Sequence, residues 1–278
     1  MTRAPGAGSF GLGGIGAGIA FALMYLPLLA VTAFSFNAAR HGLGWKGFTT
    51  DWYVRLAVDE RVREAAINTA ITATVSTAIA PVLGSLLALG LERTPWSRRG
   101  RSALEAVTIL PVVAPDIILA ACLVVAFAGF QWLAGRIGWE SAPFQRGFMM
   151  MIVGHVAFQV SFVALVVRAR IAVIGAHLEE AAHDLYATSW YFHRRVLLPL
   201  LAPGIVAGAI LAFTLSLDDF VVTFFASSPT STTLPLVIYA SLRRGLSPEM
   251  HALSTVVFAA SVVLTLALAM LSRPRSAA

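Results

Sequence analysis

Uncharged apolar runs recur along this chain, and each is long enough to form a helix that crosses a membrane. A hydrocarbon core of roughly 30 Å takes about 20 helical residues, and six stretches of the sequence reach that length. We expect spans at about residues 15–36, 65–91, 106–130, 147–167, 201–225 and 252–271. The sequence therefore predicts an all-α integral membrane protein with six transmembrane helices.

The composition supports a membrane protein built as one unit. The chain is 58% hydrophobic and 12% charged, with a mean hydropathy of +0.80, outside the range of a soluble domain with a charged surface. The longest outside segment, 37–64, is too short to fold alone. We expect residues 1–278 to form a single transmembrane domain with its core at about 65–271. No convincing internal repeat supports an inverted-repeat secondary carrier.

The charge distribution indicates a membrane topology rather than a nucleic-acid partner. The pI near 10.2 and the net charge of +6 come from basic residues in short loops, not from one patch. Placing the N-terminus in the cytoplasm puts 11 of the 20 basic residues inside, including the concentrated 93–101 cluster. We therefore expect both termini in the cytoplasm. The first apolar run is too long for a cleaved signal, which favours a retained helix.

The most polar interruption of the apolar pattern is the segment 178–199, which contains the string EAAHDLYATSWYFHRRVLLP. Its first eight residues favour a short helix, Thr188 or Ser189 can cap a second one, and Pro199 marks entry into the fifth span. We expect a helix, a turn and a helix at the cytoplasmic surface. The aromatic run 190–192 offers apolar anchors for a partner. The alternative is an ordinary amphipathic interfacial loop.

This segment resembles the EAA loop of ABC importer permeases, in which Glu-Ala-Ala and a turn precede a hydrophobic residue, any residue, Leu and Pro. The matching residues are Glu180, Ala181, Ala182, Val196, Leu198 and Pro199. The resemblance implies a type I ABC importer permease fold with cytoplasmic coupling helices, in which Glu180 meets a basic residue of an ATP-hydrolysing subunit. Tyr186 stands where the family usually has glycine, and a bulky residue in a left-handed turn costs roughly 1 to 2 kcal/mol.

Further motifs narrow the resemblance to the PotC-type permeases of spermidine/putrescine importers. They are GFTTDWY at 47–53, APDI at 114–117, FTLSLDDFVV at 213–222 and LSPEMHAL at 246–253. The similarity covers nearly the whole chain and implies a multi-pass subunit of the bacterial inner membrane. Its implied partners are a second permease, an ATPase dimer, a periplasmic binding protein and membrane lipid, with no nucleic acid. No cofactor is implied in this chain, because ATP and Mg would be bound by the ATPase.

Three carboxylates, Asp116, Asp218 and Asp219, lie inside expected spans, at a cost of about 2.5 to 3.5 kcal/mol each on insertion scales. A polyamine cargo with separated ammonium groups would explain carboxylates along a substrate pathway. Neighbouring residues of a helix point about 100° apart, so we expect one of the tandem pair to be structural. The alternative for the pair is interhelical hydrogen bonding. The alternative for Asp116 is that Pro111 and Pro115 break the helix and the carboxylate caps freed N–H groups.

The remaining candidates are weaker. Trp52 in an outside loop could close over cargo or contact the delivering protein, although interfacial tryptophan is more often a membrane anchor. His155 and Gln159, four apart on one face of the fourth span, favour an interhelical hydrogen-bonding pair over a proton relay. The insert's histidines have no converging cysteine or carboxylate set, so no metal site is expected. The single lysine, Lys46, excludes the G-x-x-x-x-G-K-[ST] phosphate-binding loop.

The sequence thus predicts a non-hydrolytic permease subunit of an ATP-driven ABC importer, with a polyamine delivered by a periplasmic binding protein as the cargo. One alternative keeps the same machine with another small cation or a metal chelate as cargo. A second alternative, from a different class, is a stand-alone secondary carrier or channel. In that case the EAA-like segment would have no ATPase to meet.

Overall fold

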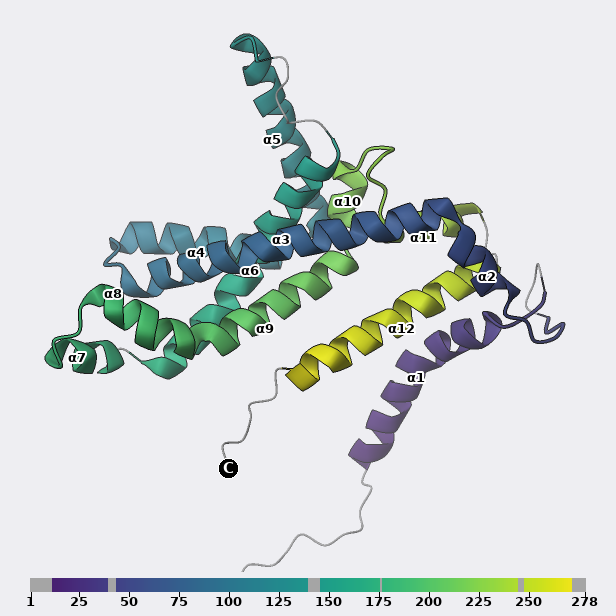
Figure 1. Ribbon diagram of the computed structural model, residues 1–278, viewed down its shortest axis with the longest axis horizontal. Coiled ribbons are helices and arrows are strands. Elements are labelled where there is room, and N and C mark those ends of the chain that lie inside the picture. The colour runs from purple at the N-terminus through teal and green to yellow at the C-terminus, as the bar shows by residue number, and fades with distance from the viewer. Residues whose placement is uncertain (1–11, 40–43, 140–145, 176, 245–247, 272–278) are drawn as a thin grey trace, which may run out of the picture. The chain divides into compact units, whose positions relative to one another are not determined.

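The chain is almost entirely helical in its computed structural model, which describes residues 12–39, 44–139, 146–175, 177–244 and 248–271 (Figure 1). The first six helices are α1 (Leu12–Phe34), α2 (Asp51–Val58), α3 (Glu60–Arg93), α4 (Arg98–Val113), α5 (Asp116–Arg136) and α6 (Phe148–Ile174). The segment after α6 holds α7 (His177–Asp184), α8 (Ser189–Tyr191) and a π-helix, η1 (Phe192–Leu197). The last helices are α9 (Leu198–Leu217), α10 (Val221–Ala226), α11 (Leu234–Arg244) and α12 (Pro248–Leu271).

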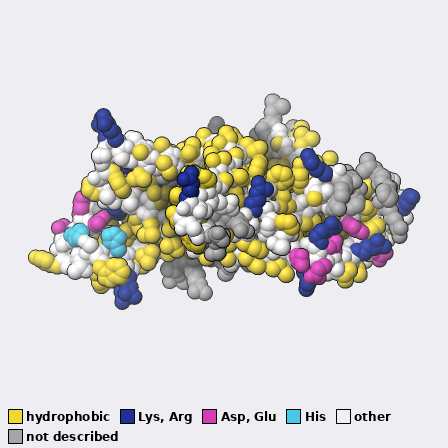
Figure 2. Space-filling view, turned by 90° about the horizontal axis from the view of Figure 1, so that it is seen from above, with side chains coloured by type: hydrophobic (Ala, Val, Ile, Leu, Met, Phe, Trp, Pro, Cys, Tyr) yellow, Lys and Arg dark blue, Asp and Glu magenta, His cyan; other side chains and the backbone are white. Residues whose placement is uncertain are grey.

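Five helical stretches of the described chain are long and apolar enough to cross a membrane. They are Gly16–Phe34, Glu60–Arg93, Asp116–Arg136, Phe148–Ile174 and Ser189–Leu217. Hydrophobic side chains accordingly cover much of the face seen in Figure 2. The predicted all-helical membrane fold is confirmed. The sixth crossing stays a prediction, because the apolar stretch Pro248–Val263 of α12 is shorter than the others. Both termini, whose cytoplasmic location we predicted, lie outside the described residues.

Two of the predicted spans are interrupted rather than continuous. The expected helix 106–130 divides between α4 and α5, because Pro115 offers no N–H and forces Ala114 into an extended conformation, with ψ at 142°. The expected helix 201–225 stops at the end of α9, and residues 218–220 are non-helical before α10 begins. Both interruptions lie beside the aspartates that we singled out.

The described residues fall into two compact units. The terminal unit takes the residues up to Asp59 together with Ile238–Leu264, and the central unit takes Glu60–Val237 with the end of α12. The single-domain organisation expected from the sequence stays a prediction. All three aspartates and the EAA-like segment belong to the central unit.

The central unit is built on close packing of α3, α6 and α9, which lie side by side in Figure 1. Val163 of α6 contacts glycines on both neighbours: a Cβ on Gly84 would lie 2.7 Å from its Cβ, and one on Gly208 would lie 3.2 Å from its Cγ1. Small residues at such contacts let membrane helices approach closely enough for dispersion contacts to hold them together. The three helices therefore form the frame on which the site residues are mounted.

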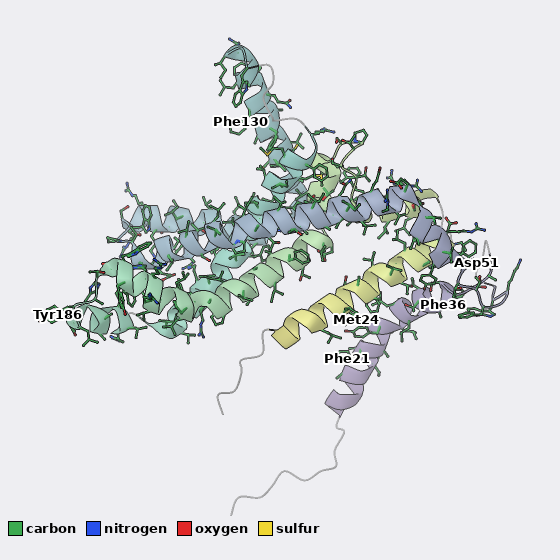
Figure 3. The ribbon with its side chains drawn as sticks, viewed as in Figure 1. Phe21, Met24, Phe36, Asp51, Phe130 and Tyr186 are labelled. Carbon is green, nitrogen blue, oxygen red and sulfur yellow. The ribbon has the colours of Figure 1, made fainter. Side chains whose placement is uncertain are left out.

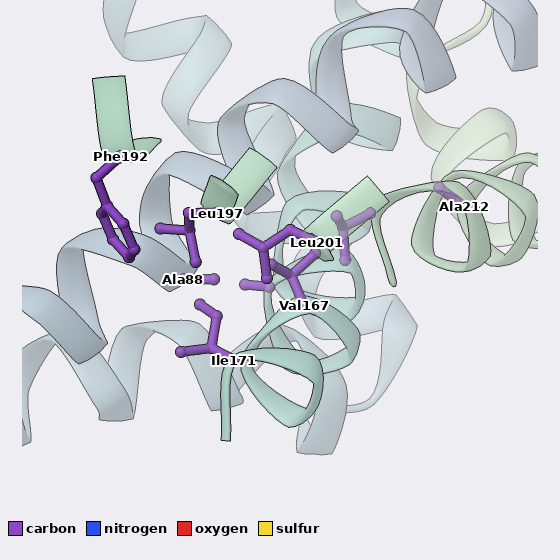
Figure 4. Close-up of a cluster of buried hydrophobic side chains, with 9 residues drawn as sticks. Ala88, Val167, Ile171, Phe192, Leu197, Leu201 and Ala212 are labelled. Atoms are coloured by element: carbon purple, nitrogen blue, oxygen red, sulfur yellow. The ribbon is translucent and has the colours of Figure 1, made fainter. Parts of the chain in front are cut away.

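A buried hydrophobic cluster ties the EAA-like segment to this frame (Figure 4). Phe192 and Leu197 of η1 pack with residues of α3, α6 and α9, and both are essentially inaccessible to solvent. The other members are Ala88, Val163, Ala164, Val167, Ile171, Leu201 and Ala212. Fully burying a large side chain contributes roughly 1.5 to 3 kcal/mol, so these two residues hold η1 against the helices.

In the terminal unit, the side chain of Asn37 bonds to the backbone of residues close to it in the chain. Its amide oxygen accepts hydrogen bonds from the backbone N–H groups of Ala39 (3.1 Å) and Lys46 (2.9 Å), and its Nδ2 donates to the carbonyl of Gly44 at 2.9 Å. Asn37 itself is 3% exposed and also forms an isolated backbone bridge with Phe48. One buried amide side chain therefore binds the backbone of residues 39, 44 and 46.

Candidate functional site

The three predicted carboxylates come together in one pocket of the central unit. The pocket has a volume of about 370 Å³. It is lined by Pro111, Asp116, Leu119, Phe158, Phe162, Leu215, Asp218, Asp219, Phe220, Val221 and Val222. Phenyl rings from α6 and from the segment after α9 therefore stand beside the carboxylates. Acidic groups with aromatic faces between them can bind a cation that has an apolar chain.

Each carboxylate is placed by a helix end. Asp116 is the first residue of α5, directly after Pro115, and its side chain is exposed. Asp218 and Asp219 follow the last residue of α9. Our premise that the tandem pair lies on a continuous helix is therefore wrong, and the non-helical backbone lets both residues line the same pocket.

The two tandem aspartates nevertheless have different tasks. Asp219 accepts hydrogen bonds from the N–H groups of Val222 (3.3 Å) and Thr223 (2.9 Å) and from Oγ1 of Thr223 (2.8 Å). It thereby satisfies the first N–H groups of α10, as a capping residue does. Asp218 is exposed, so its carboxylate remains accessible from the pocket. The expectation that one member of the pair is structural fits Asp219.

The carboxylate of Asp116 makes no hydrogen bond or ion pair with any other residue that the structure describes. The alternative in which its carboxylate caps the freed N–H groups of α5 is therefore not seen. The helix does break at Pro115, but α4 runs through Pro111 without interruption. Asp116 is thus an accessible carboxylate in the pocket wall, like Asp218.

A buried polar network lies behind the pocket and crosses three helices. Nδ1 of His155 lies 2.6 Å from Oγ of Ser216, and its Nε2 lies 3.3 Å from Oδ2 of Asp219. Nε2 of Gln159 donates to Oγ of Ser76 at 3.1 Å and to the carbonyl of Ala212 at 3.0 Å. The predicted interhelical role of His155 and Gln159 is confirmed.

The sequence reasoning missed Phe158, Phe162 and Ser216. A signal for the phenylalanines was available, because residues 155, 158, 159 and 162 follow the three- and four-residue spacing of one helix face. His155, Gln159 and the two rings occupy that face of α6. Ser216 had no such signal, because its contact with His155 joins residues 61 positions apart.

The EAA-like segment has the predicted helix, turn and helix. The predicted first helix corresponds to α7, and Oγ1 of Thr188 accepts a hydrogen bond from the N–H of Tyr191 at 3.3 Å, as expected for a cap. In the turn, the N–H of Tyr186 donates to the carbonyl of His183 at 2.9 Å, and that of Ala187 donates to the carbonyl of Ala182 at 3.0 Å. These two bonds are those of a Schellman motif.

Tyr186 occupies the left-handed position of that motif, with φ at +59°. It is the only non-glycine residue with a positive φ in the described part of the chain. Its side chain is 96% exposed and points away from the helices at the tip of the turn (Figure 3). The turn therefore keeps the geometry that glycine favours, although a tyrosine fills the position.

The two glutamates of α7 face different surroundings. Glu179 forms an ion pair with Arg93 at the end of α3, and Arg93 also donates to the carbonyl of Gly175. Glu180 is exposed, and its one partner among the described residues is the ring of His177 on its own helix, at 3.3 Å. Glu179 thus anchors α7 to the frame, and Glu180 is accessible to another protein.

The remaining motif residues divide between packing and surface. Ala182 and Val196 pack against the buried cluster of Figure 4. Ala181, Leu198 and Pro199 are exposed. The sequence motif therefore marks two faces of one segment: a buried face that fixes it and an exposed face around Glu180.

Trp52 belongs to the terminal unit and is buried there. Its side chain is 6% exposed, its Nε1 donates to the carbonyl of Asn37 at 2.8 Å, and the guanidinium of Arg55 lies 5.2 Å from the ring centroid. This position gives the ring a packing role. The predicted contact with cargo or with a delivering protein stays a prediction that the burial of the ring disfavours.

Comparisons with known proteins relate most of the chain to transport proteins. A family model described as binding-protein-dependent transport system inner membrane component matches residues 80–275. The spermidine/putrescine transport system permease protein PotC of Escherichia coli (strain K12) is 34% identical over 256 residues, which is 92% of each chain. The putrescine transport system permease protein PotI of the same strain is 36% identical over 244 residues, covering 87% of this chain and 84% of that one.

Solved structures show the same fold at lower identity. A chain of a bacterial ABC transporter involved in the import of the acidic polysaccharide alginate matches with a TM-score of 0.73 and 20% identity, covering 94% of both chains. A chain of the MetNI methionine ABC transporter in an inward-facing conformation matches with a TM-score of 0.57 and 18% identity, covering 81% of this chain and 98% of that one.

Proposed function

Because the chain belongs to the family of binding-protein-dependent transport system inner membrane components, we propose that it is the permease subunit of an ATP-driven importer of polyamines. The membership confirms the resemblance that the EAA-like segment indicated. The relatives that share a third of its residues carry spermidine or putrescine in their names. The cargo that we assign is therefore a polyamine of this type.

The structural observation that supports this cargo is the pocket that holds Asp116 and Asp218 beside phenyl rings. A polyamine presents ammonium groups separated by methylene chains. Two accessible carboxylates can neutralise two of those groups, while Phe158 and Phe162 contact the chain between them. Two unit charges about 4 Å apart attract by roughly 4 kcal/mol at an effective dielectric constant near 20. An anionic cargo would be repelled by the same groups.

We assign energy coupling to α7 and the turn that follows it. Glu180 is exposed and would meet a basic residue of a separate ATPase subunit, while Glu179 holds α7 on α3. The chain has one lysine and no phosphate-binding loop of the P-loop type, so in this proposal ATP and Mg are bound by the ATPase dimer. The remaining partners are a second permease subunit and a periplasmic binding protein. The proposed location is the bacterial inner membrane, with both termini cytoplasmic.

The cargo is tested by ATP-dependent uptake of labelled spermidine and putrescine into vesicles that hold the complete transporter and its binding protein. Loss of one charged contact costs roughly 1.5 to 3 kcal/mol, so Asp218→Asn should lower the uptake rate about tenfold or more. The same change at Asp51, an exposed aspartate at the start of α2, is the matched control and should leave uptake unchanged. Normal uptake by Asp218→Asn at normal expression would contradict the assigned cargo contact.

Coupling is tested by co-purification of the ATPase subunit with the permease. Glu180→Arg should abolish co-purification and uptake together, while Glu64→Arg, at an exposed glutamate of α3, should affect neither. ATP turnover by the intact complex without polyamine movement would favour an importer of another small cation or a metal chelate. Polyamine movement that needs no ATPase would favour a stand-alone carrier and contradict the proposal.

A further inference from the structure

A second cavity lies at the other end of α9 and has aliphatic walls. Its volume is about 360 Å³. It is lined by Leu89, Trp190, His193, Arg194, Leu197, Leu198 and Leu201. The four leucines come from α3, η1 and α9, and the two basic side chains stand on η1. The cavity therefore combines an apolar interior with a cationic edge.

Arg194 at this edge and the neighbouring Arg195 have no acidic partner among the described residues, unlike Arg93 and Arg168. Arg93 is paired with Glu179, and Arg168 contacts Glu92 at 2.7 Å. Arg194 and Arg195 are exposed, and no carboxylate within the described ranges lies at ion-pair distance from either of them. Their charges are available to an anionic group from outside the chain.

The cavity lies at a membrane–water boundary. The apolar helical stretch Ser189–Leu217 has 29 residues, or about 44 Å at 1.5 Å per residue. It exceeds a hydrocarbon core of roughly 30 Å by about nine residues. Because charged side chains are costly inside the hydrocarbon core, the extra residues that lie outside it are those at the end of the stretch that carries Arg194 and Arg195. Trp190, which is 73% exposed, is of the type that gathers at this depth.

We propose that this cavity binds an anionic phospholipid, with one acyl chain between the leucines and the phosphate on Arg194. An acyl chain matches the aliphatic walls, and a headgroup at the boundary matches the height of the Arg194 guanidinium group. An ATPase surface is the competing occupant. It is less suited, because the proposed ATPase contact uses Glu180 of α7, which does not line this cavity. The inference does not depend on the cargo.

The experiment measures lipid retained by the assembled transporter. Complexes are released from nanodiscs that contain equal amounts of phosphatidylglycerol and phosphatidylcholine, and bound lipid is counted by native mass spectrometry. We expect phosphatidylglycerol to be retained preferentially, and Arg194→Gln to lower its retention about fivefold. Arg98→Gln is the matched control, because Arg98 is an exposed arginine of α4 that forms no ion pair with a described carboxylate and does not line the cavity. It should leave retention unchanged.

Three results would overturn the proposal. Equal loss in the Arg194 and Arg98 variants would mean that the lipid responds to net charge alone. Competition by glycerol phosphate, which has no acyl chain, would indicate a free-phosphate site. Retention by the permease pair alone, but not by the complex with its ATPase, would mean that the ATPase covers the cavity.

Discussion

Replacing Tyr186 with glycine should stabilise the turn of the EAA-like segment. Tyr186 has φ at +59° and a side chain that is 96% exposed, so the change removes a strained backbone conformation and almost no packing. A non-glycine residue in this conformation costs roughly 1 to 2 kcal/mol, which the change to glycine removes. Glycine also loses more backbone entropy on folding, which offsets roughly 0.5 to 1 kcal/mol of that stabilisation. The net stabilisation is about 0.8 kcal/mol, or about fourfold in the opening equilibrium.

Hydrogen exchange measures that equilibrium directly. The N–H of Ala187, bonded to the carbonyl of Ala182 at 3.0 Å, is released only when the turn opens. In Tyr186→Gly its protection factor, corrected for the intrinsic rate, should rise about fourfold. Leu185→Gly is the matched control, because Leu185 is 82% exposed and has no positive φ. Its protection should fall, since glycine adds freedom there without relieving strain.

The result that would refute this reasoning is an unchanged or lower protection factor in Tyr186→Gly. The tyrosine would then not be strained, and the Schellman hydrogen bonds would be maintained by contacts outside the turn. A rise in both variants would point instead to a general effect of glycine on exchange. Only opposite changes in the two variants support strain at position 186.

Further predictions concern packing, the polar network and the anchor of α7. In Gly84→Leu, even the added Cβ would lie 2.7 Å from the Cβ of Val163. The variant should therefore lose about 1 to 3 kcal/mol or more of folding stability, measured as a lower thermal midpoint of the purified protein. His155→Leu leaves buried polar groups unpaired, so it should lower both the midpoint and the maximal uptake rate, with partial recovery in His155→Gln. Glu179→Arg should weaken ATPase co-purification by placing like charges together, and the added change Arg93→Glu should restore it.

The sequence was sufficient for the features that depend on local pattern. Apolar runs of about 20 residues predicted the long helices, and the Glu-Ala-Ala string with a hydroxyl cap predicted α7, the turn and Thr188. The carboxylates that a membrane interior disfavours were the ones that line the pocket. In each case the physical signal is contained in a few neighbouring residues.

The end of α9 was not predictable in this way. The stretch 201–225 has no glycine or proline near residue 218 that would stop a helix. The helix ends there in a region where Asp219 caps α10 and contacts His155 of α6. Contacts between residues far apart in the chain therefore lie at the end of α9. A hydropathy pattern contains no information on such contacts.

The π-helix had no sequence signal either. Phe192 and Leu197 lie five positions apart and are both buried in one cluster. A wider turn with i→i+5 hydrogen bonds brings such a pair closer to one face than an α-helix does. The local geometry thus agrees with packing against α3, α6 and α9, which is known only once the fold is known.

The length of α3 has a mechanical consequence. Its 34 residues, Glu60–Arg93, extend about 51 Å. Near one end Asn68 donates to the carbonyl of Thr232 at 2.9 Å, and at the other end Arg93 forms an ion pair with Glu179 of α7. A stiff rod of this length acts as a lever, since a tilt of about 5° around its middle moves each end by roughly 2 Å. Pro81 removes one main-chain donor within the rod. If α3 bends, the bend should therefore occur at the turn that contains Pro81. The stiffness of this one turn then limits how much of a displacement of α7 is transmitted along α3 to its opposite end.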